Sequence, residues 1–407
     1  MTLVDIVANA LLFVGIGILA LILKRFIQIP FTLILVLLGF AYSFVIGHFG
    51  WDTGIRANNF QDLMMFVLLP VLIFEAAFSL NEKLLYRFLP NILTMATVGL
   101  VISTGVTAIL LFYGIAHSGF PIVAALLAGV VVSATDPVAV VSQLKQLGAP
   151  EDLNALIEGE SLVNDATAIV LFALLLSIAQ GSTESTILSG LQQFFVVLIG
   201  GILVGLILGF IIAKISEWMT LDVSESALMS IVLAYGSFYI AEHLLHVSGI
   251  VAVLCAALSY KRFAPKIAQC HYDFMHNWWQ SLGYIANIFV FVLLGLVITL
   301  DMFTHMWIAM LIAIVAALVA RIIATYFSVW INHHIWGEKL NSKYPPIMIW
   351  GGLRGAVTIA LVLSLPTNLP YWWTIQSIGF GVVLFTLVFQ ATTTPLLIKK
   401  LKLSGNQ

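Results

Sequence analysis

The sequence predicts an all-α integral membrane protein with about thirteen transmembrane helices. First, 61% of its 407 residues are hydrophobic and only 9% are charged, and the mean hydropathy is +1.08, outside the range of soluble globular proteins. Second, thirteen apolar stretches are candidates to cross roughly 30 Å of hydrocarbon at about 1.5 Å per helical residue. Third, almost all positive charges between these stretches fall on one predicted face.

The thirteen spans follow one another closely, since no predicted loop exceeds about twenty residues and no flexible linker interrupts them. We therefore expect a single membrane domain over residues 1–407. Asp5 precedes the first span and Lys24 follows it, an order of charges that predicts a retained helix and not a signal peptide. The boundary between the eighth span and the short ninth span, at His246–Gly249, is the least clearly marked. The spans run approximately from 3 to 23, 30 to 47, 62 to 80, 89 to 115, 121 to 144, 152 to 179, 187 to 213, 224 to 245, 248 to 260, 279 to 300, 304 to 332, 345 to 365 and 371 to 398.

The lysines and arginines predict the orientation of the chain. With the N-terminus outside, fourteen of them fall on the cytoplasmic side and only Arg56 falls outside, as the positive-inside rule expects. A missed or additional helix would scatter the later charges over both faces, so the asymmetry supports an odd number of spans. We expect a cytoplasmic C-terminus and a location in the inner membrane of a cell. The fourteen residues are Lys24, Arg25, Lys83, Arg87, Lys145, Lys214, Lys261, Arg262, Lys266, Lys339, Lys343, Lys399, Lys400 and Lys402.

Composition and motifs exclude several classes of function. The net charge of -2, without a long run of one sign, excludes a nucleic-acid partner. The run Gly15–Ala20 fits a dinucleotide-binding fingerprint only formally, because it lies within an apolar helix with no strand before it. The sequence contains no Gly-x-x-x-x-Gly-Lys phosphate-binding loop and no evident hydrolase constellation. We therefore expect no ATP coupling, no cofactor and no enzymatic activity.

Ionisable residues near the middle of predicted spans point to a functional site, because a charge at the bilayer centre costs about 2.5 to 3.5 kcal/mol even on lenient scales. Two of these spans are also interrupted: Thr135-Asp136-Pro137 places a proline in the fifth, and residues 351–355 place three glycines in the twelfth. Broken helices in corresponding positions of two halves predict a transporter's binding site, where free backbone carbonyls replace the water shell of a cation. The four ionisable residues are Asp136, Asp165, Arg321 and Arg354.

Helical spacing separates the two carboxylates of the sixth span. Glu160 and Asn164 share one face. Ser161 and Asp165 share the adjacent face, about 100° to 140° away. We assign Asp165 the transport role, because a buried carboxylate beside a hydroxyl can hold either a proton or a small cation, but poorly both. Glu160 is a candidate for a structural pair with a buried arginine, whose charge is costly without a partner.

Three stretches of this sequence resemble, in order and at the matching helices, the signature stretches of the monovalent cation/proton antiporters, specifically the NhaP and sodium/proton exchanger branch. They are Ser133–Val140, Gly159–Asp165 and Gly351–Val357. The resemblance implies an NhaA-like antiporter fold of two inverted six-helix repeats, in which the fifth and twelfth helices are unwound and cross, and it implies a homodimer. The implied core part covers approximately 89–179 and 304–398, and the implied dimerisation part covers approximately 3–80 and 187–300.

The resemblance also implies roles for single residues. Arg321 is implied to pair with Glu160, and Arg354 to stabilise the crossing beside Asp136. The pair Asn164-Asp165 resembles the electroneutral branch, since one titrating carboxylate that exchanges one proton for one monovalent cation moves no net charge. The implied Na⁺- and proton-binding residues are Asp165, Ser161, Asp136, Thr135 through its main-chain carbonyl, and Glu75.

The residues themselves leave some of these roles open. Asp136 is either a direct ligand or a charge that balances helix ends. Glu75 is either a ligand or a lining residue of the inner vestibule.

The predicted function is secondary antiport of Na⁺ or Li⁺ against H⁺, with one proton exchanged for one cation, by alternating access in a lipid bilayer. The transported ions are its only expected small-molecule partners. Sodium transport and pH homeostasis are the implied physiological roles. K⁺/H⁺ exchange is an alternative, because oxygen ligands around one carboxylate do not fix the ionic radius. A passive cation channel is a further alternative, because broken helices and buried carboxylates also occur in channels.

Overall fold

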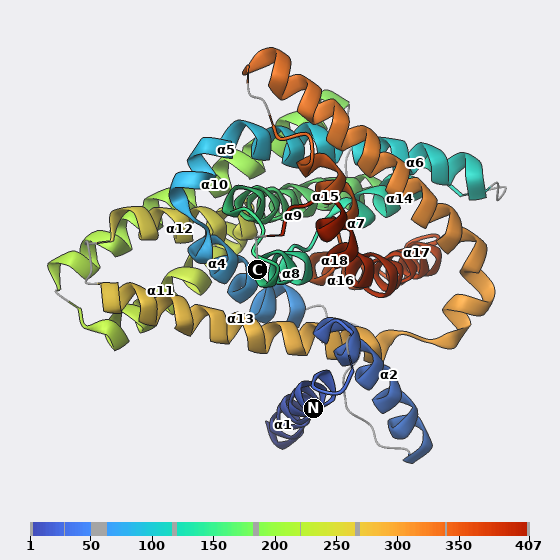
Figure 1. The fold of residues 1–407 in the computed structure, drawn as a ribbon, viewed down its shortest axis with the longest axis horizontal. Helices are drawn as coiled ribbons and strands as arrows, with labels where there is room; N and C mark the ends of the chain where they lie inside the picture. Colours follow the sequence, from blue (N-terminus) through green and yellow to red (C-terminus); the bar gives the residue numbers. More distant parts are fainter. Residues whose placement is uncertain are drawn as a thin grey trace. The chain divides into compact units, whose positions relative to one another are not determined.

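The computed structural model describes residues 3–27, 29–49, 63–115, 120–181, 187–219, 221–264, 269–337 and 340–404 (Figure 1). These residues are almost entirely helical, and the isolated β-bridge found among them joins Asp136 to Leu353. Arg56, Lys266 and Lys339, which were used to predict the orientation, lie outside the described residues.

The helices follow the chain in the order α1 (Leu3–Lys24), α2 (Phe31–Phe49), η1 (Leu63–Leu68), α4 (Leu69–Ser79), α5 (Glu82–Thr94), η2 (Met95–Gly99), α6 (Leu100–Ile115), α7 (Ile122–Ser133), α8 (Val138–Gln146), α9 (Glu151–Ala179), α10 (Ile187–Trp218), α11 (Val223–Tyr239), η3 (Ile240–Leu244), α12 (Gly249–Phe263), α13 (Gln269–Val297), α14 (Leu300–Ile335), α15 (Tyr344–Trp350), α16 (Ala356–Leu363), α17 (Trp372–Phe385), η4 (Thr386–Gln390) and α18 (Ala391–Lys400). The η segments are π-helical turns that continue the neighbouring α-helices.

Each of the thirteen predicted spans coincides with one of these helices or with consecutive helical pieces. Within the described residues, seven continuous helical stretches are long and apolar enough to cross a membrane by length and composition. That all thirteen segments cross a membrane stays a prediction. The seven stretches are Glu82–Ile115, Glu151–Ala179, Gln192–Trp218, Val223–Leu244, Tyr272–Val297, Leu300–Ile335 and Trp372–Lys400.

The uncertain boundary between the eighth and ninth spans has a clear structural basis. The helical turn η3 ends at Leu244, and His246 adopts a left-handed backbone conformation with φ of 53°, which ends a right-handed helix. The side chain of Ser248 then accepts a hydrogen bond from the backbone N–H of Val251 and caps the start of α12. These two spans are therefore separate helices.

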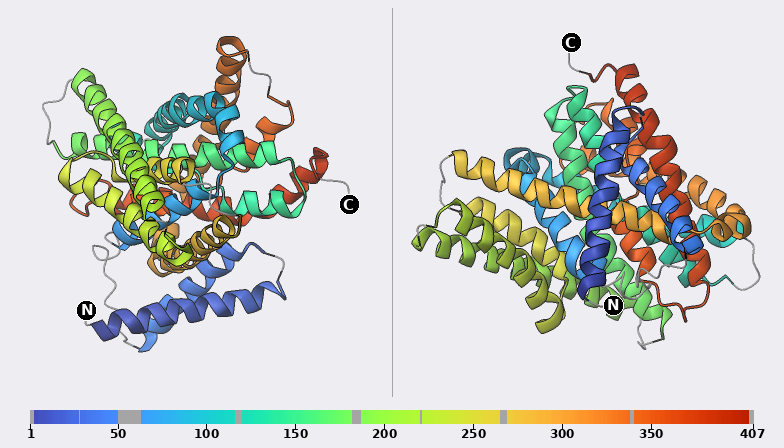
Figure 2. Two further views of the ribbon diagram at one scale, coloured as in Figure 1. Left: turned by 90° about the vertical axis from the view of Figure 1, so that its left-hand side faces the viewer. Right: turned by 90° about the horizontal axis from the view of Figure 1, so that it is seen from below.

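The chain divides into two compact units, which are residues 1–61, 81–180 and 287–407 for the first and residues 62–80 and 181–286 for the second. In the first unit, α6 packs against α7 and α14, and α9 packs against α5 and α7 (Figure 1). In the second unit, α10 runs along α12, with α4 and α11 also against α12 (Figure 2). The units place α1 and α2 with the first unit and divide α13 after Ala286. Which helices form a dimer stays a prediction.

Helix α7 lies in the interior of the first unit, and its small side chains allow this position. Nearly every residue from Ala124 to Ser133 is buried. At Gly129 a Cβ atom would lie only 2.6 Å from the carbonyl oxygen of Thr104 on α6, so glycine permits the close approach of the two helices. The interruption that follows α7 is thereby held inside the unit.

Candidate functional site

The two interrupted spans meet at their interruptions. The first separates α7, which ends at Ser133, from α8, which begins at Val138, and the second separates α15 from α16. The backbone N–H of Asp136 in the first interruption donates a 2.8 Å hydrogen bond to the carbonyl of Leu353 in the second. Two segments more than two hundred residues apart thus form one crossing.

The carboxylate of Asp136 accepts hydrogen bonds at the N-termini of both half-helices at this crossing. Its Oδ1 atom accepts a 2.9 Å hydrogen bond from the N–H of Val138, the first residue of α8. Its Oδ2 atom accepts a 3.3 Å hydrogen bond from the N–H of Ala356, the first residue of α16. A Cβ atom at Gly355 would overlap with this carboxylate, so glycine is needed there. Asp136 therefore balances two positive helix ends, and a direct role in cation binding stays a prediction.

Arg354 places a positive charge at the C-terminal end of α7, where the helix dipole is negative. Its Nε atom donates a 2.6 Å hydrogen bond to the carbonyl of Val132 in the last turn of α7, and its Nη1 atom donates to the carbonyl of Gly352. The side chain is buried, and no ion pair of Arg354 is found among the described residues. The side chain of Arg354 thus lies at the crossing and binds backbone carbonyls, and its role in stabilising the crossing stays a prediction.

Arg321 on α14 forms a bidentate ion pair with Glu160 on α9. Both bonds, Nη1 to Oε1 and Nη2 to Oε2, are 2.8 Å long, and the exposed fractions of the two side chains are 7% and 1%. The same guanidinium donates a 3.1 Å hydrogen bond to the carbonyl of Met348 on α15. The pair therefore ties three helices together. At Gly352 a Cβ atom would lie 2.9 Å from Nε of Arg321 and 3.2 Å from Nη1 of Arg354, so both arginines flank this glycine.

Three polar side chains join the sixth predicted span to the first interruption. The hydroxyl groups of Thr135 and Ser161 lie 3.0 Å apart. The Nδ2 atom of Asn164 donates to the Oγ1 atom of Thr135 at 3.0 Å and to the carbonyl of Ser133 at 3.1 Å. Helical spacing places Asn164 on the same face of the helix as Glu160. Its amide nevertheless bonds to the interrupted chain, which the hydroxyl of Ser161 also contacts.

Asp165 follows this cluster on α9 and is less satisfied than the other carboxylates at the crossing. Its Oδ1 atom is buried and has no hydrogen-bond partner among the described residues, and the same holds for Oδ1 of Asn164. The backbone N–H of Thr135 lies near the carboxylate, and the charges of Asp136 and Glu160 act on it. Carboxylate, amide and hydroxyl oxygens in one place are the donor set that a hard cation prefers.

Glu75 lies on α4 in the second unit. Its Oε1 atom accepts a 3.1 Å hydrogen bond from the hydroxyl of Ser79, one helical turn further along. A contribution of Glu75 to cation binding stays a prediction.

Some residues at the crossing were not singled out by the sequence. The hydroxyl of Thr358 on α16 donates a 3.4 Å hydrogen bond to the carbonyl of Ala134, and the hydroxyl of Thr386 accepts one of 3.1 Å from the N–H of Arg354. Threonines within apolar helices are common and carry no distinctive signal, so only the position of Thr358 three residues after Gly355 could have indicated a role.

Two small cavities border the charged residues. One is lined by Asp136, Thr32 and Arg354, and the other by Arg321, Arg354 and Gln390. Each has a volume of about 10 Å³, which is close to the minimum for a single water molecule. The side-chain oxygens of Thr32 and Gln390 are buried and have no hydrogen-bond partner among the described residues, which suits an ordered water at both places.

Comparison with known proteins places this geometry in context. The transmembrane family described as "Sodium/hydrogen exchanger" matches residues 10–400 of the chain. The chain is 34% identical over 396 residues to the Na(+)/H(+) antiporter ApNhaP of Aphanothece halophytica, covering 97% of this chain and 74% of that protein. It is 31% identical over 411 residues to the Na(+)/H(+) antiporter NhaH of Halobacillus dabanensis, covering 98% of both. The solved structure of the sodium proton antiporter MjNhaP1 from Methanocaldococcus jannaschii at pH 8 superposes with a TM-score of 0.82 at 21% identity, covering 98% of this chain and 99% of that one, which shows a shared fold.

Proposed function

Because the chain belongs to the sodium/hydrogen exchanger family, we propose that it is a secondary antiporter that exchanges Na⁺ or Li⁺ for H⁺ across a cell membrane. The relatives named above are Na⁺/H⁺ antiporters, and the family consists of transporters. The ion gradients, and not ATP, supply the driving force in this proposal.

One observation supports the assignment of the exchanging group. Three carboxylates belong to the crossing, and two of them already have full partners: Asp136 has two backbone N–H groups and Glu160 has Arg321. Asp165 is the carboxylate of the three that retains a buried oxygen without a partner. A buried carboxylate must be neutralised, and a proton or a monovalent cation can do this in turn. Competition of the two ions for Asp165 couples their movements.

The proposed cation ligands besides Asp165 come from the first interruption, α9 and α4. They include the side chain of Ser161, whose hydroxyl lies 3.0 Å from that of Thr135, and the main-chain carbonyl of Thr135 and the carboxylate of Asp136 in the interruption. Glu75 is retained in the proposal as a ligand from α4. We assign a structural role, holding the interrupted helices in place, to the Glu160–Arg321 pair, to Asn164 and to Arg354.

The proposed stoichiometry is one proton for one cation. Asn164 cannot titrate, and its Nδ2 atom is committed to two hydrogen bonds with the interrupted chain. A single titrating carboxylate, Asp165, then carries either ion and moves no net charge over a full cycle.

We further propose that the core part moves against a dimerisation part to expose the site to each face in turn. The proposal includes a homodimer, an external N-terminus and a cytoplasmic C-terminus, which rest on the resemblance and on the distribution of lysine and arginine.

Reconstituted exchange tests the proposal. Purified protein in liposomes with a trapped pH dye is challenged with Na⁺, Li⁺ and K⁺ in turn, using the wild type, Asp165→Asn and Glu158→Gln. Glu158 lies on the same helix but pairs with Lys145 at 2.8 Å near the exposed end, so its variant is a matched carboxylate-to-amide control. We expect Na⁺ and Li⁺ to move protons through the wild type and the control, and not through Asp165→Asn.

Each other result has a defined meaning. Normal exchange by Asp165→Asn shows that another group carries the ions. A response to K⁺ that exceeds the response to Na⁺ identifies a K⁺/H⁺ antiporter. Cation flux without coupled proton movement identifies a channel and contradicts antiport.

A further inference from the structure

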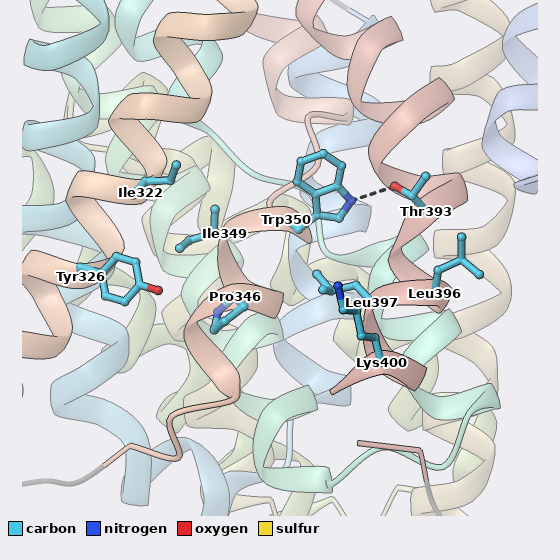
Figure 3. Close-up of a pocket in the computed structure, with 9 residues that line it drawn as sticks. All are labelled: Ile322, Tyr326, Pro346, Ile349, Trp350, Thr393, Leu396, Leu397 and Lys400. Atoms are coloured by element: carbon cyan, nitrogen blue, oxygen red, sulfur yellow. Dashed lines mark hydrogen bonds between the residues drawn. The ribbon is translucent and has the colours of Figure 1, made fainter. Parts of the chain in front are cut away.

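A groove of about 500 Å³ opens on the first unit between α14, α15 and α18 (Figure 3). Its walls are mainly aliphatic, with Ile322 from α14, Ile349 from α15 and Leu397 from α18. The volume lies within the range of about 300 to 1,000 Å³ that is usual for sites of small ligands. The groove is separate from Asp165, which does not line it.

Polar groups border one part of this apolar groove. Figure 3 shows the side chain of Lys400 lying beside Leu397 and the hydroxyl of Tyr326 directed across the groove. The indole N–H of Trp350 donates a 2.8 Å hydrogen bond to the hydroxyl of Thr393, so this ring is held in a fixed position. No ion pair of Lys400 is found within the part of the chain that the structure describes, which leaves its charge available to a ligand.

The position of the groove along the helices suggests its surroundings. Lys400 is the last residue of α18, at the end that the positive charges predict to be cytoplasmic. Lysine, tryptophan and tyrosine are the residues that gather where a transmembrane segment meets the membrane surface. Tyr326 is 53% exposed, so the groove opens on the outer face of its unit.

We propose that this groove binds an anionic phospholipid of the cytoplasmic leaflet. Its acyl chain lies along Ile322, Ile349 and Leu397, and its phosphate lies on the ammonium group of Lys400. A positive charge above an apolar channel complements the charge and the shape of such a lipid, whereas a zwitterionic headgroup carries its own positive group and gains less from Lys400. The proposal rests on the proposed membrane location, but not on which ion is exchanged.

The bound lipid would contact a helix that reaches the ion site. Ile349 lines the groove and also the small cavity that contains Arg321 and Arg354. It belongs to α15, whose Met348 carbonyl accepts a hydrogen bond from Arg321. The lipid therefore supports the half-helix that leads into the crossing.

Thermal unfolding in detergent tests the proposal without any transport measurement. The midpoint of unfolding is measured against increasing phosphatidylglycerol, or phosphatidylcholine with the same acyl chains, for the wild type, Lys400→Gln, Lys400→Arg and Lys399→Gln. Lys399 is the adjacent exposed lysine and does not line the groove, so its variant is the matched control. We expect phosphatidylglycerol to stabilise the wild type and the Lys399 variant at similar concentrations. The concentration for half-maximal stabilisation should rise about fivefold in Lys400→Gln, since one charge is lost, and should change little in Lys400→Arg.

The same lipid titration is carried out on a further groove variant, Leu397→Trp, and on the transport variant Asp165→Asn. Leu397→Trp fills the groove and should also weaken the effect of phosphatidylglycerol, which decides the matter if Lys400→Gln does not fold. The lipid effect should persist in Asp165→Asn, so failure of the antiport proposal would not be mistaken for failure of this one. Equal stabilisation by the two lipids, or equal lipid responses of the Lys399 and Lys400 glutamine variants, would overturn the proposal.

Discussion

Replacing Glu160 by glutamine should destabilise the protein far more than the same change at Glu158, two residues earlier on α9. Both carboxylates lie 2.8 Å from a cationic nitrogen. The pair of Glu160 with Arg321 has exposed fractions of 1% and 7%, whereas the pair of Glu158 with Lys145 has 21% and 62%. Loss of one partner from a buried pair costs about 3 to 5 kcal/mol, because the other charge stays buried alone. Loss of one partner from an exposed pair costs about 0 to 1 kcal/mol.

The free energies of unfolding can be compared by titrating the purified variants with sodium dodecyl sulfate in mixed micelles. We expect a difference of at least about 2 kcal/mol between Glu160→Gln and Glu158→Gln. The double variant Glu160→Met with Arg321→Met should recover much of the loss, because it removes both charges and keeps the volume filled. If the two glutamine variants differ by less than about 0.5 kcal/mol, the bidentate pair does not exist in the bilayer-embedded protein and the reasoning fails.

Three further outcomes are expected. Gly355→Ala should lower the exchange rate about a hundredfold, the loss expected when a site is misplaced by about an ångström, because the added Cβ displaces the carboxylate of Asp136. Gly105→Ala, with open space around its Cβ, should stay near the wild type, and equal rates of the two variants would contradict the packing argument. Thr135→Ala should raise the KM for Na⁺ about fivefold, because the lost hydroxyl bonds this segment to Ser161 and Asn164 and so holds its main-chain carbonyl in position. Thr135→Ser should stay close to the wild type, and an equal KM in both variants would show that the hydroxyl has no such role. Exchange through Asp165 should not respond to an imposed membrane potential, because one-for-one exchange moves no net charge. A cycle that moved one net charge would gain about 2.3 kcal/mol per 100 mV. A clear voltage response, measured in potassium-loaded proteoliposomes with valinomycin, would exclude one-for-one exchange.

The helices were predictable from the sequence because burial in lipid imposes a simple rule on length and polarity. A continuous apolar stretch such as 304 to 332 has no alternative to a helix in hydrocarbon, and α14 covers it. Proline and glycine also act locally, so the interruptions at Pro137 and at 351–355 were visible without knowledge of the rest of the fold.

The partners of the charged residues were much less predictable, because they depend on which helices meet. Periodicity gives the direction of a side chain within its own helix, but not the neighbour it reaches. Asn164 illustrates this limit, since its spacing grouped it with Glu160 and its hydrogen bonds group it with Thr135. Arg354 illustrates another, since a buried guanidinium suggests a carboxylate partner and the structure provides the carbonyl of Val132. Local sequence contains no record of such backbone acceptors.

The carboxylate of Asp136 joins the beginnings of α8 and α16, which come from opposite halves of the chain. Pulling these half-helices apart would break both hydrogen bonds and leave the anion without the two amide groups that now stabilise it. Any cycle of the protein that preserves this joint must therefore bend somewhere else, and spin labels placed on α8 and α16 should keep one separation whichever side of the membrane the site faces.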